Sequence, residues 1–273
     1  MISVFGFFFF IFGLIIGSFL NVVIYRMNTA RSFGGRSACM SCMNKLAWYE
    51  LVPVFSFLGL QGRCRSCKTK ISWQYPLVEF MTGLVFATLF FKFQDLFFSN
   101  TLIFVFNYFY YILMFSILIV ITGYDMKHKI IPDGLSITFG ALAFVGMFFM
   151  VGNGILGFSF HFPFVLEFFS GILLALPFYI LWLVSRGAWM GLGDAKLALG
   201  LGWFLGLAMA LSGIVLAFWI GTIIGLGLIV LSKIYPMGNG GYGMKSEIPF
   251  APYLAIGAFI AFICELNLFN IYF

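Results

Sequence analysis

Residues 101–133 read TLIFVFNYFYYILMFSILIVITGYDMKHKIIPD, and this stretch decides the expected fold. Its first part, 101–123, carries no charged residue and is long enough to cross a bilayer as a helix, which takes about 20 apolar residues. Asp125 stands just beyond the run, and Asp133 follows in the triplet Ile-Pro-Asp. A carboxylate near a bilayer is costly unless it is paired or hydrated. The stretch therefore predicts a membrane helix that ends in a polar site.

The rest of the chain has the same apolar character. Its 273 residues are 63% hydrophobic and 9% charged, with a mean hydropathy of +1.08. This composition indicates a polytopic membrane protein and excludes an ordinary soluble domain. Because lipid offers the backbone no hydrogen bonds, the spanning segments should be helices, which gives an all-α fold. Apolar runs predict about eight transmembrane helices, at 2–24, 76–92, 101–123, 134–151, 163–185, 195–211, 213–232 and 249–267, with the break between the sixth and the seventh placed at Ser212-Gly213.

Lys and Arg residues set the expected orientation, because they gather on the cytoplasmic side of a membrane protein. If the segment 26–75 lies in the cytoplasm, all of the 15 Lys and Arg residues except Lys92 fall on that side. Both termini then lie outside, and Asp125 faces the cytoplasm. This topology also explains the net charge of +6. We therefore expect membrane lipid, and no nucleic acid, among the partners.

The segment 26–75, between the first two predicted membrane helices, contains two Cys-x-x-Cys motifs. Paired motifs of this kind are typical of four-thiolate zinc sites, in which each tight turn supplies two ligands. The alternatives are two disulfides or free thiols, and a reducing cytoplasm disfavours disulfides. Four thiolates leave no open coordination position, so the zinc would be structural and would help a small segment to fold. The four expected ligands are Cys39, Cys42, Cys64 and Cys67.

Four further residues each have a structural and a functional interpretation. Asn21 lies in an apolar run, where it would either bond to a neighbouring helix or belong to a site at the cytoplasmic end. Glu79 falls one turn into the second predicted helix, near the positive end of the helix dipole, which is a favourable structural position. Glu50 and Gly62 stand out in the apolar stretch between the two cysteine pairs.

A second acid, Asp194, follows the glycines of Gly191-Leu192-Gly193 at the start of the sixth predicted helix. Such glycines allow a tight turn and the close approach of another segment. Asp194 has the alternative role of a helix N-cap, as does Asp133. Two carboxyl groups that share one proton can activate water and protonate a carbonyl oxygen or a leaving amine. We therefore expect Asp125 and Asp194 to meet as the acidic pair of a protease.

Taken together, these motifs resemble those of bacterial type IV prepilin peptidases and, more distantly, of the wider group of GxGD intramembrane aspartyl proteases. The resemblance covers nearly the whole chain and keeps the order and spacing of the motifs. One departure is Ala251, where the family often has Gly. The matching stretches are Gly17-Ser18-Phe19-Leu20-Asn21, the two Cys-x-x-Cys motifs, Tyr75-Pro76-Leu77-Val78-Glu79, Asp125 with Ile131-Pro132-Asp133, Gly191-Leu192-Gly193-Asp194-Ala195-Lys196-Leu197, and Ile248-Pro249-Phe250-Ala251-Pro252-Tyr253-Leu254.

The resemblance implies a bifunctional enzyme of the cell inner membrane. It would cut the short basic leader from type IV prepilins or pseudopilins on the cytoplasmic side, after a Gly. It would then methylate the new N-terminal residue, usually Phe, with S-adenosylmethionine. The family's motifs place the catalytic roles on Asp125 and Asp194 and the metal ligands on the four cysteines. No soluble Rossmann-type domain fits in the loops, so S-adenosylmethionine would bind at the membrane–cytoplasm surface, with the candidates Asn21, Glu50, Gly62 and Glu79.

The expected organisation has three parts: a first transmembrane helix at 1–25, a cytoplasmic zinc-binding segment at 26–75, and a membrane domain with the protease site at 76–273. Two rival functions stay open. One is a peptidase that lacks methylation, which labelled S-adenosylmethionine would reveal. The other is a transporter or structural subunit whose aspartates carry ions or cap helices, which Asp-to-Asn replacement would reveal.

Overall fold

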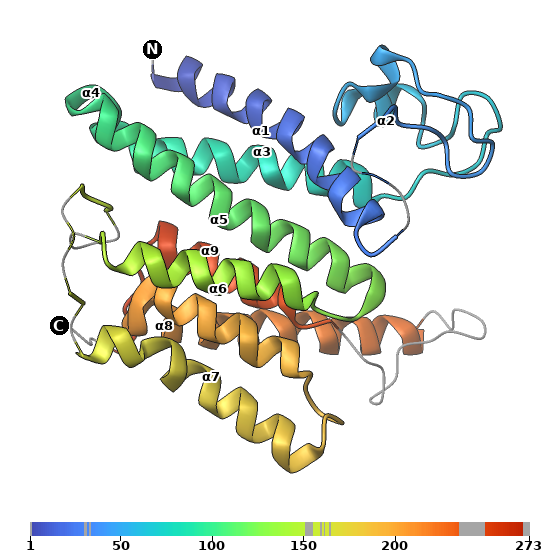
Figure 1. Ribbon diagram of the computed structural model, residues 1–273. Helices are drawn as coiled ribbons and strands as arrows, with labels where there is room; N and C mark the ends of the chain where they lie inside the picture. Colours follow the sequence, from blue (N-terminus) through green and yellow to red (C-terminus); the bar gives the residue numbers. More distant parts are fainter. Residues whose placement is uncertain are drawn as a thin grey trace. The chain divides into compact units, whose positions relative to one another are not determined.

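The computed structural model describes residues 2–29, 32, 34–150, 155–158, 160, 162–163, 165–234 and 249–269. Within these residues the chain is helical, and β-structure is limited to isolated bridges (Figure 1). The all-α prediction is confirmed. The elements are α1 (Ile2–Arg26), the 3-10 helix η1 (Trp48–Leu51), α2 (Phe55–Gly59), α3 (Gln74–Lys92), α4 (Gln94–Ser99), α5 (Thr101–His128), α6 (Asp133–Met147), α7 (Val165–Ser185), α8 (Leu192–Ile234) and α9 (Ala251–Ile263).

Five helices are long and apolar enough to cross a membrane, namely α1, α3, α5, α7 and α8. Large apolar side chains stand exposed on several of them, as Leu102 and Ile223 do at 74% and 71%. A water-soluble protein would not leave such a surface uncovered, whereas lipid solvates it. The chain is therefore a multi-pass membrane protein. Two shorter apolar helices, α6 and α9, have 15 and 13 residues.

Helix α8 has 43 residues and contains one non-helical residue, Gly206, with φ 76° and ψ 165°. A helix of this length would be about 65 Å long at about 1.5 Å per residue, roughly twice the hydrocarbon core of a bilayer. The predicted break at Ser212-Gly213 is wrong, because both residues are helical and the interruption lies at Gly206. Its backbone angles are open to glycine and strained for other residues, which is why the break occurs there.

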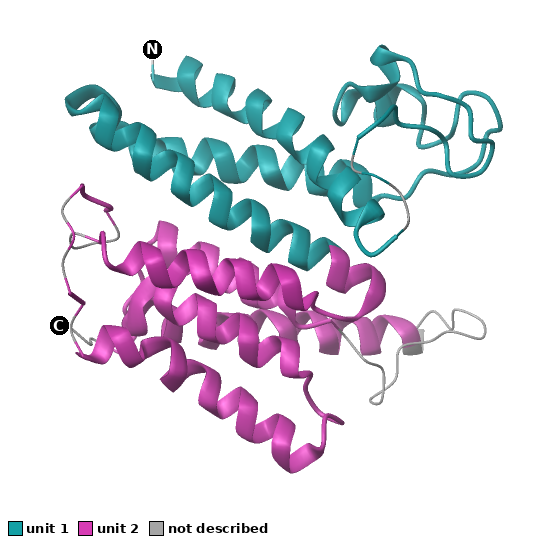
Figure 2. Cartoon of the chain, viewed as in Figure 1, with its two compact units in different colours: residues 1–123 teal, residues 124–273 magenta. Residues whose placement is uncertain are grey.

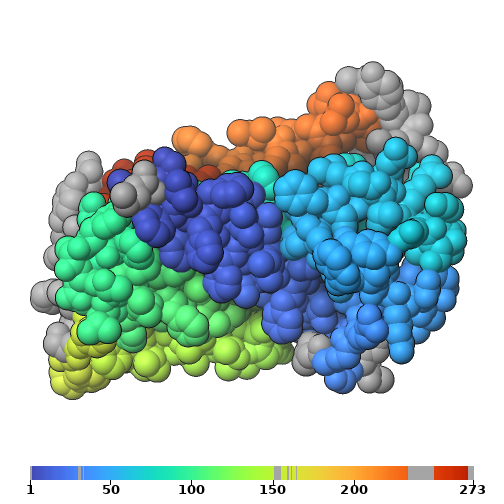
Figure 3. All heavy atoms as spheres, turned by 90° about the horizontal axis from the view of Figure 1, so that it is seen from above, coloured from blue at the N-terminus to red at the C-terminus, as the bar shows by residue number. Residues whose placement is uncertain are grey.

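The chain divides into two compact units, Met1–Gly123 and Tyr124–Phe273, with the boundary inside α5 (Figure 2). In the first unit, α1 packs on α3 with almost no side chain between the two backbones. A Cβ atom on Gly13 would lie 2.8 Å from the Cα of Gly83, and one on Gly17 would lie 2.7 Å from the Cα of Glu79. Small residues allow this approach, which membrane helices use to gain packing contacts. Helix α1 and the cysteine-rich segment both reach the surface of this unit (Figure 3).

In the second unit, α8 is the central element and contacts α6, α7 and α9. Glycines of α8 again make the close approaches. A Cβ on Gly202 would lie 2.6 Å from the Cα of Gly171 on α7, and one on Gly200 would lie 2.6 Å from the ring of Phe139 on α6. The hydroxyl of Ser170 donates to the carbonyl oxygen of Gly202 at 2.9 Å across the α7–α8 contact. This packing fixes the beginning of α8, where Asp194 lies.

Candidate functional site

Asp125 lies in the last turn of α5, and only 4% of it is exposed. Its Oδ2 accepts a hydrogen bond of 3.2 Å from the backbone N–H of Ala251, the first residue of α9. An N–H in the first turn of a helix has no partner within the helix, so it is free to bind a carboxylate. The α5 helix then ends as Lys129 adopts a positive φ of 55°. Asp125 is thus held between the end of one helix and the beginning of another.

Asp194 is the third residue of α8 and is 8% exposed. Asp194 lies inside the helix and is therefore not its N-cap, and its carboxylate interacts with the backbone N–H of Gly191, which precedes the helix. The two glycines before it differ in how closely other atoms approach them. A Cβ on Gly193 would lie 2.7 Å from the Cβ of Ile131, whereas one on Gly191 would meet nothing closer than Oδ2 of Asp194 at 3.6 Å. Gly193 therefore brings the start of α8 against the segment that follows α5.

The two aspartates come together within the second unit. The charge of Asp125 acts directly on Asp194, and both residues are buried. Like charges that interact in a poorly solvated place disfavour each other's ionised form. The fold thus brings together the two acids that the sequence singled out.

Asp133 differs from this pair in its exposure to solvent and in its partner. It is 69% exposed, and its Oδ1 accepts a bond of 2.6 Å from Nζ of Lys196. The N-cap of α6 is Pro132, and Asp133 is the first helical residue. The N-cap interpretation of Asp133 is therefore wrong. Its carboxylate instead links the beginning of α6 to the beginning of α8 beside Asp194.

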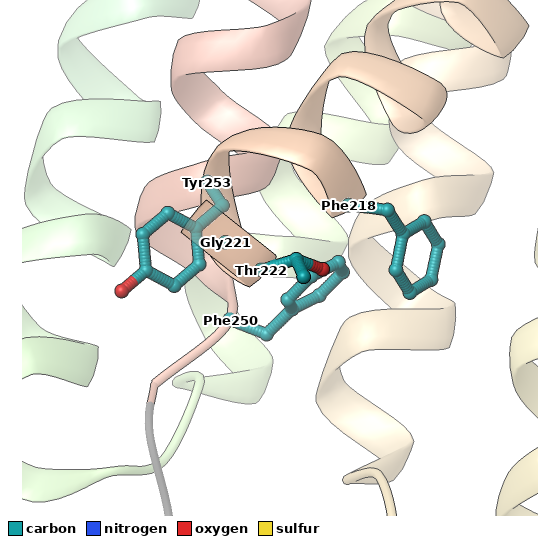
Figure 4. Close-up of a pocket in the computed structure, with 5 residues that line it drawn as sticks. All are labelled: Phe218, Gly221, Thr222, Phe250 and Tyr253. Carbon is teal, nitrogen blue, oxygen red and sulfur yellow. The ribbon is translucent and has the colours of Figure 1, made fainter. Parts of the chain in front are cut away.

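A cavity of about 180 Å³ lies between the second half of α8 and the beginning of α9 (Figure 4). Aromatic side chains form most of its walls, and the ring centroids of Phe218 and Phe250 are 5.0 Å apart. No pattern in the sequence pointed to this cavity, because its walls come from segments separated by residues 235–248, which lie outside the described residues. Phe250 directly precedes Ala251, which binds Asp125. The cavity lining is completed by Gly221, Thr222 and Tyr253.

The two Cys-x-x-Cys motifs fold into a pair of matching turns in the first unit. In each, the N–H four residues after the first cysteine bonds back to that cysteine's carbonyl oxygen, from Met43 to Cys39 and from Lys68 to Cys64. Met43 and Lys68 also share a positive φ, of 56° and 60°. A short antiparallel bridge closes each turn, Ala38 with Lys45 and Arg63 with Lys70. Two equivalent turns each present two sulfur atoms toward a common point.

The four sulfur atoms lie within 4.8 Å of one another, and the cysteines are free thiols. The Sγ atoms of Cys39 and Cys67 are 3.8 Å apart. Tetrahedral zinc with Zn–S bonds of about 2.3 Å places its sulfur ligands about 3.8 Å apart, so the residues fit such an ion. The cluster is the predicted one, and it can bind a metal.

The acid–base properties of the thiols also favour a cation. The side chain and the N–H of Thr69 lower the pKa of Cys67 to about 6. The Asn44 N–H favours the Cys42 thiolate, but desolvation and the neighbouring sulfur atoms outweigh it and raise the Cys42 pKa to about 11. Four thiolates this close repel one another, and a dication removes that repulsion.

Of the four candidate cofactor residues, Asn21 and Glu79 lie on the two packed helices of the first unit. The Asn21 amide donates to the carbonyl oxygen of Tyr75 at 3.0 Å, which is the expected interhelical bond. Its Oδ1 is buried without a hydrogen-bond partner among the described residues. Glu79 accepts the N–H of Val54 at 2.7 Å and interacts with the Ser18 hydroxyl. It thereby ties the segment between α1 and α3 to α3.

The other two candidates lie in the cysteine-rich segment. Glu50 accepts the N–H of Ala47 at 2.7 Å and so stabilises η1. Gly62 has a positive φ of 66° and lines a cavity of about 420 Å³. The rings of Phe57 and Trp73 meet there at 4.8 Å. The full lining is Phe57, Leu58, Gln61, Gly62, Arg63, Lys70, Ile71 and Trp73. Sequence reasoning had singled out only Gly62 in this set.

Fold and site together define a class: a helical membrane protein with an interacting pair of buried aspartates and a four-cysteine cluster. The model for the bacterial peptidase A24 N-terminal domain matches residues 11–93, and that for the type IV leader peptidase family matches residues 112–226. A relative from Aeromonas hydrophila, named prepilin leader peptidase/N-methyltransferase, is 30% identical across 92% of this chain and 88% of its own length. The chain therefore belongs to the type IV leader peptidase family.

Two further relatives carry the same name. The protein from Bacillus subtilis is 27% identical over 96% of both chains, and that from Pseudomonas aeruginosa is 28% identical over 91% of this chain and 87% of its own. No solved structure matches the chain. The matched lengths show that the chain is similar to these relatives over almost all of its extent.

Proposed function

We propose that this chain is a membrane aspartyl endopeptidase that removes the leader from type IV prepilins or pseudopilins after a Gly and then methylates the new N-terminus. The observation that carries the proposal is the meeting of Asp125 and Asp194, buried and interacting, in a chain of this family. The same two residues stand at the positions that the family's motifs give to the catalytic acids.

The pair acts on one water molecule and one peptide bond. The ionised carboxylate takes a proton from water as the water oxygen bonds to the scissile carbonyl carbon, and the other carboxyl gives its proton to the carbonyl oxygen. The C–N bond then breaks, and a carboxyl proton passes to the leaving amine. The Ala251 N–H holds Asp125 in one orientation during these transfers. The reaction needs no covalent intermediate.

The test is leader cleavage by Asp125→Asn and Asp194→Asn in proteoliposomes with a purified prepilin. Each should lower the rate about 10²–10⁴-fold, as expected for loss of general acid–base catalysis. Asp133→Asn is the matched control, because Asp133 belongs to the same motif but is exposed and paired with Lys196. It should retain most activity. Unaltered cleavage by both dyad variants would remove the protease proposal and favour the transporter or structural alternative.

For the methylation, we place S-adenosylmethionine in the cavity lined by Gly62. When bound, it supplies a methyl group on a cationic sulfur. Phe57 and Trp73 offer aromatic faces to an adenine ring and to the sulfonium, and Arg63 and Lys70 offer cations to the carboxylate. Neither cation has a hydrogen-bond or ionic partner in the described part of the chain. Asn21, Glu50 and Glu79 stay candidate cofactor-binding residues, and the buried Oδ1 of Asn21 supports a ligand contact there.

Purified protein incubated with prepilin and labelled S-adenosylmethionine tests this second activity. The expected result is a cleaved, labelled product. Cleaved product without label would exclude methylation and leave a peptidase activity only. Trp73→Ala should weaken S-adenosylmethionine binding, measured directly by calorimetry, without loss of leader cleavage.

The zinc, the orientation and the number of passes complete the proposal. We assign structural Zn²⁺ to Cys39, Cys42, Cys64 and Cys67, supported by the separation of the sulfur atoms. We place the protein in the inner membrane with eight passes, in which α6, α9 and the two halves of α8 each cross. Its three parts are 1–25, 26–75 and 76–273, and the active site faces the cytoplasm, as the Lys and Arg distribution favours.

A further inference from the structure

The segment between α1 and α3 carries a short helix, α2, with an uncovered apolar face. Phe55 and Leu58 are 67% and 60% exposed, and side chains three positions apart lie on the same face of a helix. Gly59, the next residue, is exposed as well, and a Cβ there would meet nothing within 4 Å. Phe57 points the other way and is buried. An outer face in water would carry polar side chains, so this face indicates contact with something apolar.

The depth of α2 relative to a bilayer follows from its neighbour α3. Helix α3 has 19 residues and is about 28 Å long at about 1.5 Å per residue. The hydrocarbon core of a bilayer is about 30 Å thick, so α3 is only just long enough to cross it. Its first residue must therefore lie near the edge of the hydrocarbon. Trp73 directly precedes α3 and is 73% exposed, and Trp is enriched at that edge in membrane proteins.

Two contacts hold α2 beside the beginning of α3 (Figure 1). The backbone N–H of Val54, the residue before α2, donates to Oε2 of Glu79 at 2.7 Å. Glu79 comes five residues after Gln74, the first residue of α3, which places it about 7.5 Å along the helix. The rings of Phe57 and Trp73 meet with their centroids 4.8 Å apart. Helix α2 therefore lies at the level where the hydrocarbon gives way to the lipid headgroups.

We propose that α2 is an interfacial membrane anchor, and that Phe55 and Leu58 insert into the lipid of the bilayer that α1 and α3 cross. Lipid surrounds any uncovered face at that level, and a helix that lies in the interface buries its apolar side in the boundary between headgroups and acyl chains. Leu58 also lines the cavity that contains Gly62, so the anchor holds that cavity at the membrane surface. The placement of α2 does not depend on the proposed catalytic activities.

The experiment identifies what the outer face of α2 touches. The full-length protein carries the photo-reactive residue p-benzoylphenylalanine in place of Phe55, which keeps an aromatic ring at that position. It is reconstituted in vesicles of phosphatidylethanolamine and phosphatidylglycerol, irradiated, and analysed by mass spectrometry for covalent adducts. The control carries the same residue in place of Met40, which is 52% exposed in the first cysteine turn, outside α2. In a second arm the photo-reactive residue replaces Leu58, and Phe55→Asp is compared with Phe55→Leu.

Position 55 should form lipid adducts in about tenfold or greater excess over position 40, because the transfer of one aromatic side chain from water into an apolar surrounding is worth about that factor. Phe55→Asp should lower the lipid adduct at position 58 by about the same factor, and Phe55→Leu should preserve it. Equal lipid adducts at positions 40 and 55 would overturn the proposal, as would an adduct at position 55 with a second copy of the chain or with added prepilin in place of lipid. No adduct at position 55 would show that water surrounds this face, and a lipid adduct at position 58 that survives Phe55→Asp would likewise exclude the anchor.

Discussion

Replacement of Gly193 by Ala should disable the acidic pair, whereas replacement of Gly191 by Ala should not. In Gly193→Ala the added Cβ would lie 2.7 Å from the Cβ of Ile131, while carbon atoms in contact prefer about 3.5–4.0 Å. A gap of about 1 Å must therefore open between the start of α8 and the segment after α5. Both atoms are fixed by backbone, so no side-chain rotation relieves the clash. In Gly191→Ala the added Cβ would meet nothing closer than 3.6 Å, and the glycine that it replaces has no positive φ.

The size of the effect follows from that displacement. Overpacking of this kind costs about 1–3 kcal/mol of stability, and the better helix propensity of Ala returns at most about 1 kcal/mol. Catalysis should suffer more than stability, because a misplacement of about 1 Å in a catalytic group lowers rates about 10²-fold. Asp194 directly follows Gly193 and would move with it. Gly193→Ala should thus lower kcat about 100-fold with a small loss of Tm.

The assay is leader cleavage of a purified prepilin in proteoliposomes, with thermal unfolding of the same samples in detergent. Gly191→Ala should stay within about threefold of the unaltered rate, since ordinary surface changes alter little. If both variants cleave alike, or if Gly193→Ala loses activity only in proportion to unfolded protein, the close contact with Ile131 does not position the pair.

Three further predictions concern the rest of the chain. Cys42→Ser should abolish zinc binding, measured with a colorimetric chelator. It should also make the segment 36–73 sensitive to protease, because the metal supplies the folding energy of that segment. The control Cys264→Ser should change neither result. Lys196→Met should lower the free energy of unfolding by less than about 1 kcal/mol, measured by thermal unfolding, since its 2.6 Å bond to Asp133 is solvent-exposed. A loss of several kcal/mol would show that this ion pair is important for stability. Gly257→Ala should lower the free energy of unfolding by about 1–3 kcal/mol, seen as a lower Tm, because a Cβ there would overlap a carbonyl oxygen of α8. An unchanged Tm would mean that α9 is free to move away.

Much of the fold was predictable because a bilayer leaves helices few alternatives. Each apolar run of sufficient length became a helix, since lipid cannot satisfy an open backbone. The break in α8 was misplaced for an equally physical reason. Apolarity reports where a helix can lie, whereas the interruption at Gly206 depends on which residue tolerates φ 76°. The more polar Ser212-Gly213 stays helical, because Gly213 packs on Gly257.

The sequence named the residues of the candidate site, but it did not predict their contacts. The family resemblance placed the catalytic role on Asp125 and not on Asp133, and the structure buries Asp125 and exposes Asp133. The likeness of the two cysteine turns follows from their local spacing, so the metal cluster was expected as well. The bond from Ala251 to Asp125 joins residues 126 positions apart. No local pattern predicts such a pairing, and the aromatic cavity depends on the same kind of long-range packing.

That bond changes which parts of the chain must be counted in the candidate site. The matched leader peptidase region ends at residue 226, yet Ala251, beyond it, supplies a backbone donor to the first aspartate. The next residue of α9 is Pro252, which has no N–H, so the N–H of Ala251 is the foremost donor of that helix end. Helix α9 therefore contributes through its backbone, which tolerates Ala where the family often has Gly. Because Phe250 precedes this donor and lines the cavity between α8 and α9, a displacement of Phe250 would also displace the partner of Asp125. The lining of that cavity and the orientation of Asp125 are thus joined through a single peptide unit.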